Sequence, residues 1–231
     1  ALALAASVLC TVAFAADSKS DVVTVTVTAL EQAFEGEGTE ANPYKLARWQ
    51  DLERLSVLVE GGESFAGKVF QMTEDITLPS GWIPIGCTKD GSNGISGGAN
   101  LNAFSGVFDG GNKLLTVPAG ERPLFAYVNG ATIRYLNIYG SQINGYGLVD
   151  CFTGVQMSGT AMIIDHVTLK SGTQTRYSGL IGARQFENPY AGCSAGYNAI
   201  IRNCTIESGV VIGYTGDSSE IGGFAGRMQG T

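Results

Sequence analysis

Apolar and polar residues alternate in the same order in three stretches of the chain, residues 131–138, 162–169 and 199–206. Each stretch has an isoleucine, a charged residue, a variable residue, a smaller apolar residue, Asn or Thr, and then Ile or Leu. Alignment of the three gives apolar columns at Ile133/Ile164/Ile201, Leu136/Val167/Cys204 and Ile138/Leu169/Ile206. The alternation predicts strands with one buried face, and a unit repeated in this way typically stacks on its own copies.

A second apolar motif precedes these stretches. Residues 124–130, 148–154 and 224–230 each begin with an apolar residue, have a bulky apolar residue four positions later, and have Gly two positions beyond. Residues 179–182 open in the same way. The motif starts, Leu124, Leu148, Leu180 and Phe224, are unevenly spaced, which indicates constant strands joined by turns of variable length. This favours a parallel β-solenoid over a propeller with equal blades.

Three segments carry a family resemblance: Gly-Leu-Ile-Gly at 179–182, Gly-Gly-Phe-Ala-Gly at 222–226 and Ile-Arg-Asn-Cys-Thr-Ile at 201–206. They resemble the GLUG-type repeats of bacterial surface proteins. The preceding part of the chain, from Gly36, resembles the lead-in of such proteins at 36–44, 65–68, 75–78, 82–86 and 104–110. The resemblance implies an all-β fold, a right-handed parallel β-helix. It leaves function open, because the family includes adhesin-like proteins, filaments and regions beside immunoglobulin A-specific metallopeptidases.

We expect four regions along the chain. Residues 1–16 are uncharged, apolar and end in Ala-Phe-Ala-Ala, which predicts a secretory signal peptide whose beginning is missing. Residues 17–43 are predicted to form an N-terminal strand, with alternating Val and Thr at 21–28, and a linker. Residues 44–62 are predicted to form a capping helix, and residues 63–231 the β-helix repeats. The last repeat stops where its strand is due, so we expect further repeats or domains after Thr231.

The helix prediction depends on apolar residues at three- and four-residue steps. Trp49, Leu52, Leu55 and Val59 follow this spacing, and Gly61-Gly62 ends the helix. An amphipathic helix ahead of a solenoid covers its open apolar end. We expect Trp49 to be the largest buried side chain of this cap.

Composition removes some function classes. Lys and Arg number 14 against 21 Asp and Glu, for a net charge of −7, so a basic nucleic-acid-binding surface is not expected. The chain has 33 glycines and only 15% charged residues, which favours tight turns and stacked strands. No Cys-x-x-Cys pair is present and His166 is the only histidine, so no metal site or cofactor is predicted. The pairing state of Cys87, Cys151, Cys193 and Cys204 stays open.

Candidate catalytic residues are few. Arg134, Asp165 and Arg202 form a charged column, which is either a lyase-like face or a ladder of ion pairs; we favour the ladder. His166 lies in a varied column with Tyr135 and Asn203, and no nucleophile motif lies nearby. Asp109 is interpreted as a turn former rather than a calcium ligand. A glycosidase pair is left open among the scattered carboxylates, which are Asp150, Asp165, Glu187 and Glu207.

What remains is a binding surface. The tyrosines spread through the repeats suit glycan or protein contacts, and they suit ordinary corners equally well. They are Tyr127, Tyr135, Tyr139, Tyr146, Tyr177, Tyr190, Tyr197 and Tyr214. Residues 87–103, a Gly- and Asn-rich loop, are the preferred place for a partner contact.

The sequence therefore predicts a secreted or cell-surface β-solenoid without catalytic, cofactor-binding or metal residues, which acts as an adhesin or stalk and binds a glycan or host surface protein. No nucleic acid and no membrane span are expected in this stretch. Two alternatives remain: a polysaccharide lyase-like β-helix enzyme, and an accessory region of a downstream surface peptidase.

Overall fold

The fold is all-β with a single helix in the part of the chain that the computed structural model describes, residues 34–86, 102–153, 161–181, 199–214 and 222–225. Every strand pair among these residues is parallel. The predicted signal peptide, the Val-Thr strand at 21–28 and most of the loop at 87–103 lie outside the described residues. No helix within the described ranges has the length and apolar character needed to cross a membrane.

Helix α1 (Trp49–Glu60) is shorter than the predicted helix at 44–62, because Tyr44–Leu46 forms strand β1. The helix begins where the Asp51 carboxylate accepts hydrogen bonds from the backbone N–H groups of Ala47 and Arg48, at 3.0 and 3.2 Å. It ends at Gly61, as predicted, and Gly62 follows with a φ of 103°. Its buried face, which includes Leu52, Leu55 and Val59, packs on the core near β1.

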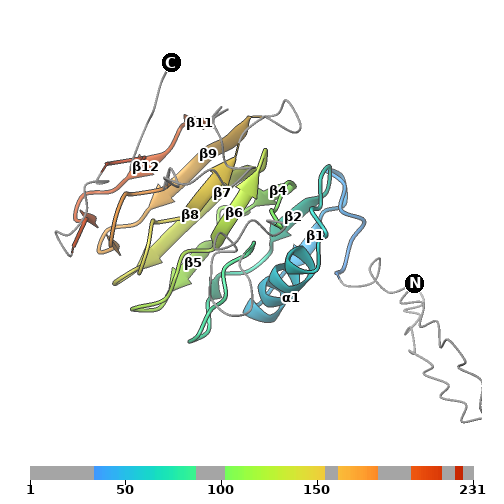
Figure 1. The fold of residues 1–231 in the computed structure, drawn as a ribbon, viewed down its shortest axis with the longest axis horizontal. Helices are drawn as coiled ribbons and strands as arrows, with labels where there is room; N and C mark the ends of the chain where they lie inside the picture. The colour runs from blue at the N-terminus through green and yellow to red at the C-terminus, as the bar shows by residue number, and fades with distance from the viewer. Residues whose placement is uncertain (1–33, 87–101, 154–160, 182–198, 215–221, 226–231) are drawn as a thin grey trace, which may run out of the picture.

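The strands form four rows of parallel neighbours. Figure 1 shows the large sheet made by the first two rows running from α1 at one end to β11 (Ala199–Arg202) and β12 (Thr205–Ile206) at the other. The strands are β1 (Tyr44–Leu46), β2 (Val69–Met72), β3 (Ile76–Thr77), β4 (Val107–Asp109), β5 (Leu114–Val117), β6 (Phe125–Asn129), β7 (Thr132–Gly140), β8 (Val149–Thr153), β9 (Met162–Leu169), β10 (Gln174–Thr175), β11 (Ala199–Arg202), β12 (Thr205–Ile206) and β13 (Val211–Ile212).

The first two rows share the long strands β7 and β9. In the first row the neighbours are β1, β2, β4, β7, β9 and β11. In the second row they are β3, β5, the later half of β7, the later half of β9, and β12. The chain bends between the two rows at Tyr135 and His166, whose φ values are 51° and 54°. One level earlier, the predicted turn at 109–112 joins β4 to β5, with Gly111 and Asn112 at positive φ.

The third row contains the second sequence motif. Here Phe125 pairs with Val149, Val149 with Ile181, and Ile181 with Ala225. This is the alignment that the motif starts at Leu124, Leu148, Leu180 and Phe224 predicted. A fourth, short row pairs Ile143 with Thr175 and β10 with β13.

The three predicted apolar columns are confirmed by the register. Ile133 pairs with Ile164, and Ile164 with Ile201. Leu136 pairs with Val167, and Leu169 pairs with both Ile138 and Ile206. On β7 and β9 all of these side chains are buried, with exposed fractions of 0 or 1%. Toward α1 the core becomes aromatic, through ring contacts that link Phe70 to Phe104, Phe104 to Phe125, and Phe125 to Phe108.

A column of glycines lets neighbouring levels approach each other closely. Gly147, Gly179 and Gly223 each precede the apolar residue of the second motif. A Cβ atom on Gly147 would lie 1.8 Å from the carbonyl oxygen of Gly179, and one on Gly179 would lie 1.8 Å from that of Gly223. Backbone thus occupies the space of a side chain, which is why the motif has Gly at this position.

Gly179→Ala should therefore destabilise the protein, by roughly 1–3 kcal/mol or more, because the Gly223 backbone must move to admit the methyl group. Urea unfolding at equilibrium would measure the loss. Gly223→Ala is the matched control, since the nearest atom to its Cβ would be Ile206 Cδ1 at 4.0 Å. Equal effects of the two substitutions would contradict the close-packed glycine column.

Ile164→Asp should cost several kcal/mol, because the carboxylate would be buried in an apolar column without a partner. Ile163→Asp, one residue earlier on the opposite and partly exposed side of β9, should cost much less. Thermal unfolding of the two variants separates these outcomes. Unchanged stability of the Ile164 variant would show that the column is not part of the core.

Candidate functional site

A row of charged side chains crosses the first row of strands. In the strand register Asp109 on β4 lies opposite Arg134 on β7, Arg134 opposite Asp165 on β9, and Asp165 opposite Arg202 on β11. Ion pairs join Asp109 to Arg134 and Asp165 to Arg202. The signs alternate from strand to strand. The predicted charged column of Arg134, Asp165 and Arg202 is thereby confirmed, and Asp109 extends it. We call these four residues the charge ladder.

Arg134 holds two carboxylates. Its Nε donates to Asp109 Oδ2 at 2.8 Å, and its Nη2 donates to Glu40 Oε2 at 2.7 Å. The hydrogen bond to Glu40 is the largest cause of a raised Arg134 pKa, and the bond to Asp109 adds to it. Glu40 comes from the segment before β1, so this ion pair links that segment to β7, in the middle of the first row of strands. Asp109 is a turn former as predicted, because Oδ1 accepts from the Gly111 N–H at 2.8 Å.

Asp165 is the most heavily bonded carboxylate of the ladder. Its Oδ2 accepts from Arg202 Nη2 at 2.9 Å, and its Oδ1 accepts from Asn203 Nδ2 at 2.9 Å. His166 Nδ1 lies 2.7 Å from the same Oδ1. Hydrogen bonding from Asn203, followed by Arg202, lowers the Asp165 pKa to about 2. At neutral pH this group is an ionised, fully engaged acceptor, which does not suit a general acid or base.

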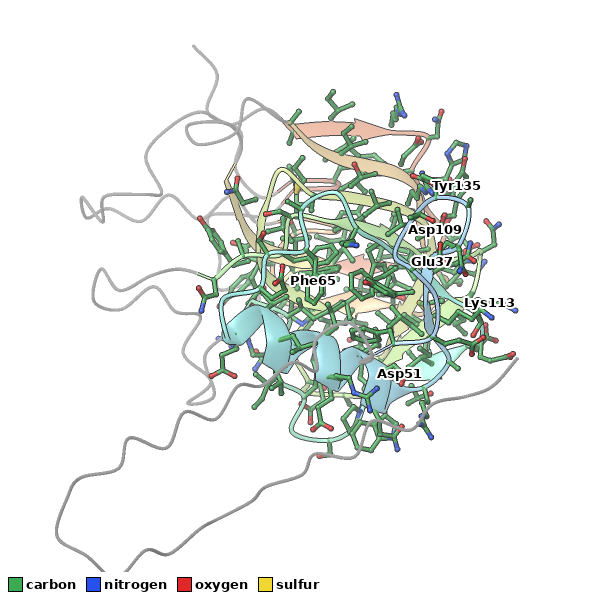
Figure 2. All side chains as sticks on the ribbon, turned by 90° about the vertical axis from the view of Figure 1, so that its right-hand side faces the viewer. Glu37, Asp51, Phe65, Asp109, Lys113 and Tyr135 are labelled. Carbon is green, nitrogen blue, oxygen red and sulfur yellow. The ribbon has the colours of Figure 1, made fainter. Side chains whose placement is uncertain are left out.

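Beside the ladder lies the bend column, formed by Tyr135, His166 and Asn203. All three have left-handed backbone, with φ of 51°, 54° and 55°. The rings of Tyr135 and His166 stack with centroids 5.0 Å apart and planes 30° apart. Tyr135 is 37% exposed, and Figure 2 shows it and Asp109 on the same side of the molecule. This agrees with the predicted exposed turn position for His166.

Asp165, His166 and Cys204 carry the residue types of a thiol catalytic triad, but the thiol faces the other way. Cys204 continues the inward column of Leu136 and Val167, and its Sγ lies 3.2 Å from the Arg202 carbonyl oxygen. Burial raises the Cys204 pKa, so the reactive thiolate is disfavoured. Cys204 is a free, half-buried thiol. The arrangement does not build a nucleophile and base pair.

Comparison with family models, curated proteins and solved structures gives no match. The resemblance to GLUG-type repeats therefore stays a prediction.

The carboxylates considered for glycoside hydrolysis are engaged separately. Asp150 pairs with Arg122 at 2.8 Å, and Glu207 pairs with Lys170 and accepts from the Ser171 N–H. The Lys170 hydrogen bond is the largest cause of a lowered Glu207 pKa. Glu187 lies outside the described residues. Within the described ranges, no group of three or more His, Cys, Asp or Glu residues is placed to hold a metal ion.

The tyrosines divide between core and surface. Tyr127 and Tyr146 are buried, Tyr139, Tyr177 and Tyr214 are half-buried, and Tyr135 is exposed. Tyr190 and Tyr197 lie outside the described residues, as do Cys87 and Cys193, while the Cys151 side chain is not described. Sequence reasoning missed Asp109 and Glu40 as members of the charged row. Alignment of Phe108-Asp109 with Ile133-Arg134 could have found Asp109, but no local signal points to Glu40.

Because the Asp165 pKa is lowered on folding from 3.8 to about 2, its bonds stabilise the fold at pH above about 4. This stabilisation should be lost as the pH falls toward 2. Carbon-detected NMR titration of the Asp165 carboxyl should give a midpoint near 2, and both Asn203→Ala and Arg202→Met should raise it. Lys68→Met, the same charge loss ahead of β2, should leave it unchanged. A midpoint near 4 in the unaltered protein would contradict the observed bonding.

Proposed function

We propose that this chain is a right-handed parallel β-solenoid that works outside a bacterial cell as an adhesin or stalk, and that it binds a glycan or host surface protein without catalysis. The order in which the chain visits its strand rows supports the solenoid. After β4 in the first row it enters β5 in the second and β6 in the third, and then returns to the first row at β7. Parallel neighbours reached by such returns suit a solenoid.

The observation that carries the proposal is that the charged groups of the ladder already bond to neighbouring side chains of the protein. Arg134 is shared by Asp109 and Glu40, and Asp165 is shared by Arg202, Asn203 and His166. Side chains that bond one another across neighbouring strands stiffen a surface. They leave little free acid or base for a lyase or hydrolase reaction at neutral pH.

Beside this stiffened row, the stacked rings of Tyr135 and His166 give a partly exposed aromatic surface next to Arg202. Aromatic rings beside a guanidinium are common in recognition surfaces, because they supply contact area with little loss of conformational entropy. The export signal predicted at residues 1–16 supports a location in the secretory route and at the cell surface. The same location suits a binding function toward glycans or host proteins.

The purified full chain can be tested on immobilised glycans and extracellular matrix proteins. We expect saturable binding, with the bound glycan recovered unchanged. Incubation with pectin-like acidic polysaccharide in the presence of calcium tests the lyase alternative. Calcium-dependent release of unsaturated products would overturn the non-catalytic proposal.

The double variant Tyr135→Asn/His166→Asn should weaken binding to the target found in this screen by at least about fivefold, since each aromatic contact is worth ~0.5–1.5 kcal/mol. Asparagine is the matched choice, because Asn203 already occupies the third place of the bend column with the same left-handed backbone. Surface plasmon resonance would give the affinities, and thermal unfolding would check the fold. Undiminished binding by a folded variant would place the contact surface elsewhere.

A further inference from the structure

A groove of about 430 Å³ lies between one face of α1 and the segment 79–83. The helix contributes Trp49, Glu53, Ser56, Val57 and Glu60, which follow one another at helical spacing. The opposite wall includes Pro79, Trp82 and Ile83. The groove thus contains both tryptophans of the chain. Trp49, expected to be the largest buried side chain of the cap, is instead only half-buried and lines this groove.

Hydrogen bonds hold both walls in place. The Ser56 hydroxyl donates to the carbonyl oxygens of Ile83 and Pro84, at 3.1 and 3.3 Å, which joins the helix to the facing segment. The Glu121 carboxylate accepts from the backbone N–H groups of Gly81 and Trp82, at 2.9 and 3.1 Å. A groove whose walls are fixed in this way needs little rearrangement to admit a ligand.

The lining is mainly apolar, and its charge has one sign. Val57 is 48% exposed on the helix side, although it is a large apolar residue. The charged side chains among the lining residues are Glu53 and Glu60, and none of the lining residues is Lys, Arg or His. Glu53 is exposed and forms no ion pair with any described residue. The groove therefore combines apolar and indole surface with negative charge at its rim.

We propose that this groove binds a small organic cation, an ammonium group carried on an aromatic or aliphatic body. The body would displace water from Trp49 and Val57, and the ammonium would lie near Glu53 and the indole ring of Trp49, which attracts cations. Trp82 is only 5% exposed and closes the opposite wall. A neutral sugar fits less well, because two polar groups of the groove are already committed. The Trp82 Nε1–H donates to the Pro123 carbonyl at 3.1 Å, and the Ser56 hydroxyl donates as described. This inference is independent of the proposed adhesin or stalk function.

Tryptophan fluorescence of the full chain tests the proposal directly, because both fluorophores line the groove. We expect a saturable change on titration with phenethylammonium chloride. The neutral analogue 2-phenylethanol should bind about two- to fivefold more weakly at low salt, as an exposed charge interaction implies. Equal binding of the two compounds, stronger binding of methyl glucoside, or the absence of a saturable change would each overturn the proposal.

Matched variants locate the site. Val57→Lys should abolish phenethylammonium binding, because it fills the groove and adds a positive charge, whereas Gln50→Lys adds the same charge to α1 outside the lining. Glu53→Gln should reduce the affinity to that of the neutral analogue, while Glu74→Gln, an exposed carboxylate outside the lining, should not change it. The three substituted helix residues, Gln50, Glu53 and Val57, are all exposed, so folding is expected to persist, and circular dichroism checks it. Binding that survives Val57→Lys in a folded protein would refute the site.

Discussion

The register between neighbouring parallel strands is the constraint on which the rest of this structure depends. Side chains alternate between the two faces of a strand, so a shift of one residue would turn Ile164 outward and Asp165 inward. Each strand therefore contributes its apolar residues to the columns of its neighbour. The glycine column favours the same register. The carbonyl oxygens of Gly179 and Gly223 lie where Gly147 and Gly179 would have a Cβ atom, so a shifted register would bring a larger residue against these carbonyls.

The charge ladder follows from this register. When Ile133, Ile164 and Ile201 align inside, the residue after each of them aligns outside, and neighbouring strands bring Arg134, Asp165 and Arg202 together. Asp109 with Arg134, and Asp165 with Arg202, then form ion pairs, whereas like charges would repel each other. These side chains are occupied with one another, so the surface is better suited to present the rings of Tyr135 and His166 than to transfer protons.

The end of the fold that carries α1 is built differently. The first strands of the stack have no further neighbour on one side, so their apolar side chains need another cover. Helix α1 supplies this cover with Leu52, Leu55 and Val59. The helix surface next to its buried face remains half-open against residues 79–83, where Trp49 and Val57 stay accessible. The groove therefore arises from the same packing that covers the core. The helix is round, and the extended segment 79–83 contacts only part of its surface.

The sequence by itself determined the strands at 131–138, 162–169 and 199–206, their relative register, the glycine end of the helix and the turn at 109–112. Repeated units stack on themselves, so alignment of the copies already describes their contacts, and Gly-Gly-Asn is a local turn signal. Only the tertiary structure decided that Glu40 reaches Arg134, that Tyr44–Leu46 joins the strand row and that Trp49 lines a groove. These features depend on how the non-repeating segments at the start of the chain meet the repeats. Contacts between segments without internal copies leave no periodic signal in the sequence.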